Sequence, residues 1–119
     1  MKQEDKDTLL KYLCMALPYD CMVTIAEGGI DGLQWDNVTL NSYLLYQIEE
    51  EDGLEYIKPY LRPMSSMTEE EHKEYEKWLP DGFNVNTFYW LLKNHFDFIG
   101  LISKGLAIEV TEDNNPYKE

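Results

Sequence analysis

Apolar residues near the N-terminus recur at helical spacing and then alternate with polar residues, which predicts a helix followed by a strand. The apolar helix face is formed by Leu9, Tyr12, Leu13, Ala16 and Leu17. Asp5 or Asp7 can cap this helix, and Pro18 ends it because proline does not continue an α-helix. From Cys21 to Ala26 the period becomes two, which is typical of a half-buried strand.

Two pairs of turn residues follow this strand. Gly28-Gly29 and Asp31-Gly32 tolerate positive φ and predict a hairpin turn. The returning strand covers residues 33–40, with a break or bulge at Asp36-Asn37. The β-prone run at residues 43–48 predicts a further strand, because aromatic and branched residues favour the extended conformation. Residues 49–53 then form an acidic turn, and residues 54–60 the next strand.

The second half of the chain carries helix signals. Thr68 and Glu71 have the spacing of a capping box, so a helix begins there and ends at Pro80-Asp81-Gly82. We place His72 on the apolar face of that helix. Another helix starts near Asn86 or Thr87. Residues 97–105 then form a short helical turn closed by a left-handed glycine, and residues 106–110 alternate as a last strand.

Together these elements predict an α+β fold. The expected sheet is small and antiparallel, either open or barrel-like, with an N-terminal helix and two or three C-terminal helices packed on it. Its length of 119 residues suits a single domain covering 1–119. Within it we expect a β-rich part at about 20–62, a helical part at about 68–105 and a frayed polar tail at 111–119.

Charge excludes one large class of function. The chain has 23 acidic and 10 basic residues, a formal net charge of −13, and Arg62 is its only arginine. Direct nucleic-acid binding depends on clustered basic side chains, so we do not expect it. Such acidity either keeps a small protein soluble or imitates the phosphate backbone towards a basic partner. We also expect no membrane segment and a cytoplasmic location, since no apolar stretch approaches the roughly 18 residues of a span.

Metal and cofactor signals are missing from the sequence. Cys14, Cys21, His72 and His95 have neither of the paired spacings that bind zinc, and the two cysteines are expected to be reduced thiols. The acidic residues 49–52 lack the alternating oxygens and central glycine of a calcium-binding EF-hand loop. We therefore predict no metal and no cofactor.

No catalytic residue is predicted either. Ser65 and Ser66 lack the Gly-x-Ser-x-Gly pattern, and Cys14 lies near a helix C-terminus, where the dipole does not stabilise a thiolate. A rival reading is a small enzyme with a scattered site, His95 with Asp97 or Glu109, which a cleft that contains a histidine with a strongly shifted pKa would favour.

The aromatic content suggests a partner site instead. Tyrosine and tryptophan anchor protein interfaces, and several of them stand near acidic residues. The candidate partner-binding residues are Glu49, Glu50, Glu51, Asp52, Glu55, Tyr60, Tyr89 and Trp90.

Three segments resemble one group of proteins. They are Leu17-Pro18-Tyr19, the block Lys58-Pro59-Tyr60-Leu61-Arg62-Pro63-Met64-Ser65-Ser66-Met67-Thr68-Glu69-Glu70-Glu71, and the block His95-Phe96-Asp97-Phe98-Ile99-Gly100-Leu101-Ile102-Ser103-Lys104-Gly105-Leu106-Ala107-Ile108-Glu109. Similar blocks occur in small uncharacterised proteins of Bacteroides-type gut bacteria and their phages. The chain departs from that group at Asp20, where the group tends to have glycine, and at Gly28-Gly29, which lengthens a turn.

The resemblance implies an accessory protein encoded among phage or prophage genes, and it carries over no catalytic residue. We expect a non-catalytic protein that binds a host or phage protein through an acidic and aromatic surface. A bolder form is a DNA-mimicking inhibitor of a defence enzyme. The alternatives are a structural component of a phage assembly and the small hydrolase-like enzyme with a scattered site.

Overall fold

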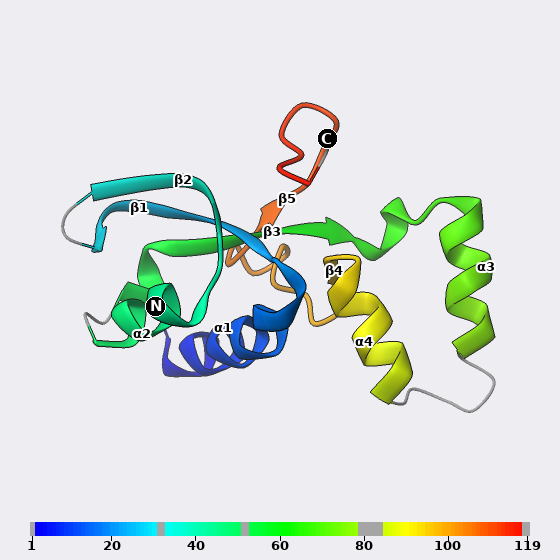
Figure 1. Ribbon diagram of the computed structural model, residues 1–119, viewed down its shortest axis with the longest axis horizontal. Coiled ribbons are helices and arrows are strands. Elements are labelled where there is room, and N and C mark those ends of the chain that lie inside the picture. The colour runs from blue at the N-terminus through cyan, green and yellow to red at the C-terminus, as the bar shows by residue number, and fades with distance from the viewer. Residues whose placement is uncertain (1, 31–32, 51–52, 79–84, 118–119) are drawn as a thin grey trace.

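The structure is a computed structural model that describes residues 2–30, 33–50, 53–78 and 85–117 (Figure 1). Within these residues the chain forms an α+β fold with four α-helices and a mixed, open five-stranded sheet. The elements in chain order are α1 (Gln3–Ala16), η1 (Leu17–Tyr19), β1 (Met22–Ile30), β2 (Leu33–Thr39), α2 (Ser42–Glu50), η2 (Gly53–Glu55), β3 (Ile57–Pro63), η3 (Met64–Ser66), α3 (Glu69–Trp78), α4 (Val85–Lys93), β4 (Phe96–Asp97) and β5 (Ile108–Glu109), where η denotes a 3-10 helix.

The sheet is mixed, so the prediction of an antiparallel sheet is wrong, and of the two predicted forms it takes the open one and not the barrel. Its order is β2-β1-β3-β4, with β5 also pairing with β3. β1 runs antiparallel to β2 and to β3, whereas β4 and β5 run parallel to β3. The parallel pairing arises because the chain leaves β3 through α3 and α4 before it returns, and parallel strands require such a crossover.

The predicted hairpin of β1 and β2 is confirmed, as is its irregularity at Asp36-Asn37. The pairs Val23↔Val38 and Ile25↔Trp35 enclose one more residue on β2 than on β1, and Asn37 has a φ of 51°. Gly28-Gly29, predicted to form part of the turn, belongs to β1 instead. Asp31-Gly32 lies outside the described residues.

The strand predicted at residues 43–48 is wrong, because this segment forms α2. Asn41 caps the helix: its Oδ1 accepts the backbone N–H of Leu44 at 2.8 Å. Leu44, Leu45 and Ile48 are buried, and positions i, i+1 and i+4 face one side of a helix. Burial of these three side chains favours the helix more strongly than the β propensity of the tyrosines favours a strand.

The capping box is confirmed. The Thr68 hydroxyl accepts the Glu71 N–H at 3.1 Å, and the Glu71 carboxylate accepts the Thr68 N–H at 3.0 Å. No described residue of α3 is buried, and His72 is exposed beside Glu76 rather than on an apolar face, so its predicted position is wrong. The predicted stop at Pro80-Asp81-Gly82 lies outside the described residues.

Residues 98–105 do not form the predicted short helix: turns occupy residues 101–105, and residues 98–100 before them are irregular. The Asp97 carboxylate starts them by accepting the N–H groups of Leu101 and Ile102, both at 2.9 Å. Gly105 has the expected left-handed conformation, with a φ of 73°. The last strand is confirmed in part, as Ile108 and Glu109 of β5.

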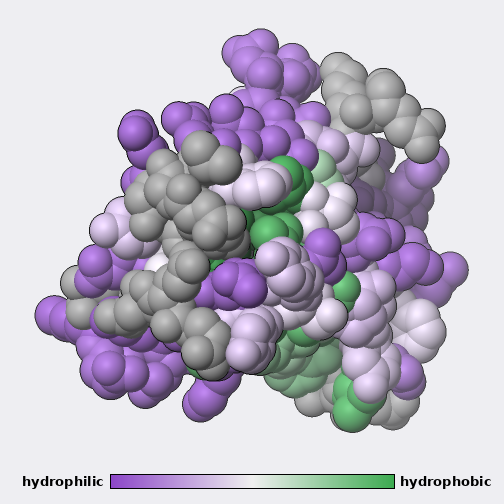
Figure 2. All heavy atoms as spheres, turned by 60° about the vertical axis from the view of Figure 1, so that its left-hand side comes forward, coloured by the Kyte–Doolittle hydropathy of each residue, from purple (hydrophilic) through white to green (hydrophobic). Residues whose placement is uncertain are grey.

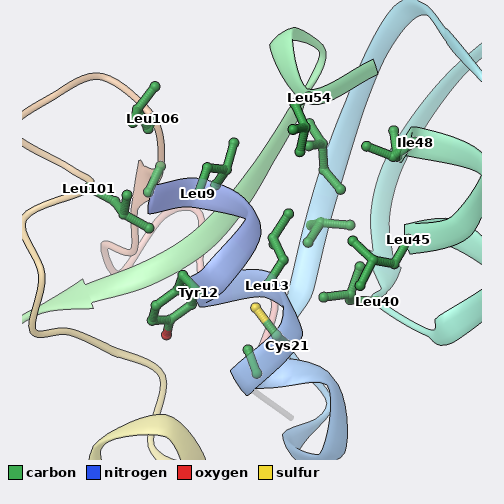
Figure 3. Close-up of a cluster of buried hydrophobic side chains, with 14 of the residues drawn as sticks. Leu9, Tyr12, Leu13, Cys21, Leu40, Leu45, Ile48, Leu54, Leu101 and Leu106 are labelled. Carbon is green, nitrogen blue, oxygen red and sulfur yellow. The ribbon is translucent and has the colours of Figure 1, made fainter. Parts of the chain in front are cut away.

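Two groups of buried side chains hold the fold together. The larger one gathers residues of α1, β1, α2, β3 and the turns before β5, and Figure 3 shows Leu9 and Leu13 of α1 among side chains from α2 and η2. The smaller one, Trp90, Leu91 and Phe96, joins α4 to β4 and supports Tyr75 of α3. The molecule extends 45 × 30 × 24 Å, with α2 and α3 at opposite ends of its long axis (Figure 1).

Candidate functional site

One end of the molecule carries exposed tyrosines beside exposed acids. Tyr43 and Tyr46 lie on the outer face of α2 and are 65% and 57% exposed, and Glu49 is also exposed on this helix. The inner face holds α2 in place, because Leu44, Leu45 and Ile48 are buried in the core. The two phenol rings are therefore presented on a fixed helix.

The chain after α2 adds to the same end. η2 contacts α2 and is anchored by buried Leu54, and Glu55 and Tyr56 next to it are exposed. The Tyr56 carbonyl accepts the Ala26 N–H at 2.8 Å, which ties this segment to β1. We call these five residues, Tyr43, Tyr46, Glu49, Glu55 and Tyr56, the acidic-aromatic end. Figure 2, with this end turned forward, shows hydrophilic side chains around paler and some hydrophobic ones near the middle of the view.

The candidate partner-binding residues do not form one surface. Glu49 and Glu55 belong to the acidic-aromatic end, and Glu50 ends α2. Glu51 and Asp52 lie outside the described residues. Tyr89 is 53% exposed on α4, and α4 lies well away from α2 along the long axis (Figure 1).

Two of these candidates, Trp90 and Tyr60, take part in contacts within the protein. Trp90 is buried, and its ring stacks with the rings of Tyr75 and Phe96, each at a centroid distance of 5.6 Å. Tyr60 is half-buried in β3, and its carbonyl accepts the hydroxyl of Tyr117 at 2.8 Å. Trp90 offers little area to a partner. The tyrosines Tyr43, Tyr46 and Tyr56, which sequence reasoning did not select, offer more.

A second polar cluster lies where β1 and β4 meet β3. The antiparallel register pairs Thr24 with Lys58 and Val23 with Pro59, so Met22 and Tyr60 are the next residues in line. They are bridged by Tyr117, whose hydroxyl accepts the Met22 N–H at 2.9 Å and donates to the Tyr60 carbonyl. Tyr117 is therefore bonded to both β1 and β3.

His95 stacks on this tyrosine, with ring centroids 3.7 Å apart. Burial, and then the positive charge of Arg62, lower the pKa of His95 to about 4, against the opposing effect of Asp20. His95 is thus neutral at pH 7. Asp97, its suggested partner in an enzyme, is committed to two backbone amides, and Glu109 is exposed in β5. The geometry therefore does not assemble the suggested acid-base pair.

Arg62 links β3 to α3. Its guanidinium donates to both Glu71 carboxylate oxygens, at 2.6 and 2.7 Å, and lies 4.3 Å from the centre of the Phe96 ring. This pairing, together with the capping bonds from Thr68, lowers the pKa of the Glu71 carboxyl. The guanidinium also donates to the Ser66 carbonyl at 3.3 Å, so Arg62 has a clear structural role.

The described part of the chain has few features of a metal-binding or reactive site. There, no three side chains among histidine, cysteine, aspartate and glutamate gather as a metal ion requires. Cys14 is exposed and Cys21 is buried, and burial raises the pKa of the Cys21 thiol to about 11. In the same residues no helix has the length and apolar character needed to cross a membrane.

Comparisons of the chain with known proteins found no match. The chain matches no protein-family model, no curated protein and no solved structure.

Proposed function

We propose that this protein is a non-catalytic accessory protein, encoded by a phage or prophage, that binds a positively charged face of another protein through its acidic-aromatic end. The observation that carries the proposal is the exposure of Tyr43 and Tyr46 beside Glu49 on one helix. The resemblance of the chain to small phage and prophage proteins supports a partner from the host or the phage.

Tyrosine side chains suit such a site for two reasons. Their rings bury a large area on binding with few rotatable bonds, and their hydroxyls can still form hydrogen bonds at a wet interface. Since the inner face of α2 is held by Leu44, Leu45 and Ile48, the partner does not have to order the helix. Pre-organisation of this kind lowers the entropic cost of association.

Charge supports a basic partner. The net charge of −13 attracts cationic surfaces over several ångströms of solvent, and Glu49 and Glu55 bring acidic groups next to the tyrosines. Complementary charge mainly raises the association rate and selects against acidic competitors. The tyrosines would then supply most of the binding energy.

The DNA-mimicking form of the proposal is narrower. The exposed acids of α3 are at the opposite end of the long axis from Glu49 and Glu55, so they do not extend this patch (Figure 1). A mimic would have to rely on the acidic-aromatic end. Competition with DNA for the partner tests this form directly.

The test is capture of partners by tagged protein from a lysate of a Bacteroides-type host, with nuclease present, followed by affinity measurement with each purified partner. The variant Tyr43→Ala/Tyr46→Ala removes both exposed rings, and Glu49→Lys reverses a charge beside them. Glu70→Lys is the matched control, because it makes the same charge change on exposed α3. The proposal predicts at least a tenfold loss of affinity for the double variant and little change for the control.

Equal affinity of the wild type and the double variant would remove the acidic-aromatic end as the binding site. Displacement of the partner by duplex DNA would support the mimic, whereas binding unaffected by DNA would leave an ordinary protein contact.

A further inference from the structure

A groove runs between α1 and α4, on a different part of the molecule from the acidic-aromatic end. One part, of about 280 Å³, is lined by Met15, Val85, Phe88, Tyr89 and Leu92. A second part, of about 430 Å³, shares Met15 and Phe88 and adds Thr8, Lys11, Phe98 and Ile99. The two helices are in contact (Figure 1), so the shared residues make the two hollows one continuous groove.

The groove is apolar and open to solvent. Val85 and Tyr89 on α4 are 61% and 53% exposed, and Met15 on α1 is exposed as well. The hydroxyl of Thr8 donates to the Glu4 carbonyl of its own helix at 2.9 Å, so it presents no unmet hydrogen bond. In an acidic chain, an exposed concave apolar surface of this kind marks a binding site rather than a solvated face.

The floor of the groove is held in one shape. The ring of Phe88 meets the ring of Phe98 edge-on at 5.3 Å, and Phe98 also contacts buried Tyr12 at 6.0 Å. The turn that carries Phe98 and Ile99 is fixed by the two hydrogen bonds to Asp97. The groove thus exists before any partner arrives, which favours binding.

Its dimensions suit a short helix. Val85, Phe88, Tyr89 and Leu92 follow i, i+3, i+4 and i+7 spacing along α4, and Thr8, Lys11 and Met15 follow i, i+3 and i+7 along α1. Seven residues of helix rise about 10 Å, so each wall is about two turns long. A third helix laid over the groove would bury its own i, i+3, i+4 and i+7 side chains, which is the helix-in-groove mode of recognition.

Lys11 supplies the charge that selects this helix. It is exposed, it is the only charged residue among those lining the groove, and it has no ion-pair partner among the described residues. Asp7, one turn earlier, accepts a hydrogen bond from Gln3 at 3.0 Å instead. An occupant with a carboxylate beside its apolar stripe would pair with the Lys11 ammonium.

We infer that the groove between α1 and α4 binds an amphipathic helix of a partner protein, and that this helix carries an acidic residue at the border of its apolar stripe. This surface is independent of the acidic-aromatic end and favours the opposite charge. The protein would then join two different partners, one at each surface.

The experiment uses the full-length protein and a displayed library of helical peptides. Apolar residues vary at i, i+3, i+4 and i+7, and the border position encodes Glu, Lys or Gln. Selection with wild type is expected to enrich Glu at the border, and Lys11→Glu is expected to shift the enrichment to Lys. A single partly exposed ion pair changes the dissociation constant about two- to fivefold, which sets the expected preference.

Two further variants test the apolar walls. Tyr89→Asp and Met15→Glu each put a charge into the groove at an exposed position and should weaken a selected peptide at least tenfold. Tyr46→Glu, at the acidic-aromatic end, is the matched control and should change its affinity less than twofold. Methionine-methyl NMR gives a direct readout, because the Met15 resonance should move on peptide addition while that of Met22 stays.

Three results would overturn the inference. The first is a library without enriched peptides. The second is a border preference that Lys11→Glu leaves unchanged. The third is a Met15 resonance that shifts with protein concentration alone, which would assign the groove to a second copy of the chain. A loss of partner capture by Tyr43→Ala/Tyr46→Ala with intact peptide binding would separate this inference from the proposed function.

Discussion

Three non-glycine residues within the described ranges have positive φ, and each stands where the chain changes direction. Asp20 ends η1 before β1, Asn37 forms the bulge of β2, and His95 turns α4 into β4. Left-handed backbone is unfavourable for residues with a Cβ, although Asn and Asp tolerate it better than most.

Replacement of Asp20 tests the free-energy cost of left-handed backbone at this position. Its φ of 54° and ψ of 41° suit glycine, so Asp20→Gly should raise the free energy of unfolding by about 0.5–1 kcal/mol. Asp20→Ala should lower it by about 1 kcal/mol, because alanine keeps the Cβ without the local hydrogen bonding of aspartate. Urea unfolding at 25 °C measures both, and equal stability of the two variants would contradict the backbone explanation.

The Tyr117 hydroxyl is a second test at this scale. Tyr117→Phe keeps the ring on His95 but leaves the Met22 N–H and the Tyr60 carbonyl without their shared partner. Polar groups left unpaired cost about 1–3 kcal/mol when fully buried, and these two are partly buried, so urea unfolding should show a loss of about 1 kcal/mol. Tyr46→Phe, at an exposed ring, should change stability by less than about 0.5 kcal/mol. A Tyr117→Phe variant as stable as wild type would contradict the bridge.

At the scale of elements, the sequence predicts best those features whose signal lies within a few neighbouring residues. The capping box of Thr68 and Glu71 is a local code, and α3 begins where it predicts. Residues 43–48 gave a mixed signal, because tyrosines favour strands while the buried leucines and Ile48 fit a helix face equally well. Asn41, a residue type that caps helices, was a sequence signal for α2, and the prediction of a strand at residues 43–48 did not use it.

The ion pair that docks α3 makes a prediction about pH. The pKa of Glu71 is lowered in the folded protein, chiefly by its hydrogen bonds from Arg62. The carboxylate therefore stabilises the fold above its unfolded pKa of about 4.5, and this contribution is lost as pH falls through the lower folded value. Glu71→Gln should cost about 1–2 kcal/mol at pH 7, since both side chains are about one-fifth exposed.

Urea unfolding of wild type and Glu71→Gln at pH 7, 5 and 3 measures the difference. The gap should be largest at pH 7 and narrowest at pH 3. Glu70→Gln, one residue earlier and exposed, is the control without such a gap. A gap that widens towards pH 3 would show that the pair does not act as described.

At the scale of the whole molecule, the sheet depends on contacts that no local pattern encodes. β3 pairs with β1 through its first residues and with β4 and β5 through its last ones, across sequence separations that periodicity cannot report. The partner site is similar: the exposure of Tyr43 and Tyr46 follows from which face of α2 meets the core. The docking of Tyr117 likewise depends on hydrogen bonds to Met22 and Tyr60, which are far from it in the sequence.

This docking leads to a prediction about the thiols. The Tyr117 hydroxyl lies 3.8 Å from the Cys21 sulfur, and the thiol is buried with its pKa raised to about 11. A thiol reagent reaches Cys21 only when the structure opens locally, whereas exposed Cys14 reacts directly. Truncation after Val110 removes the cover, so Cys21 should react at least tenfold faster, while Cys14 keeps its rate as the internal reference.

Stopped-flow labelling with a chromogenic disulfide, followed by mass spectrometry of the labelled peptides, separates the two thiols. Full-length Tyr117→Ala should reproduce the effect of truncation, because the tyrosine rather than the rest of the tail covers the sulfur. Near-UV circular dichroism of each variant checks that the core is intact, since global unfolding would also expose Cys21. Unchanged labelling of Cys21 in a folded, truncated protein would mean that the sheet closes over this thiol without its C-terminal tyrosine.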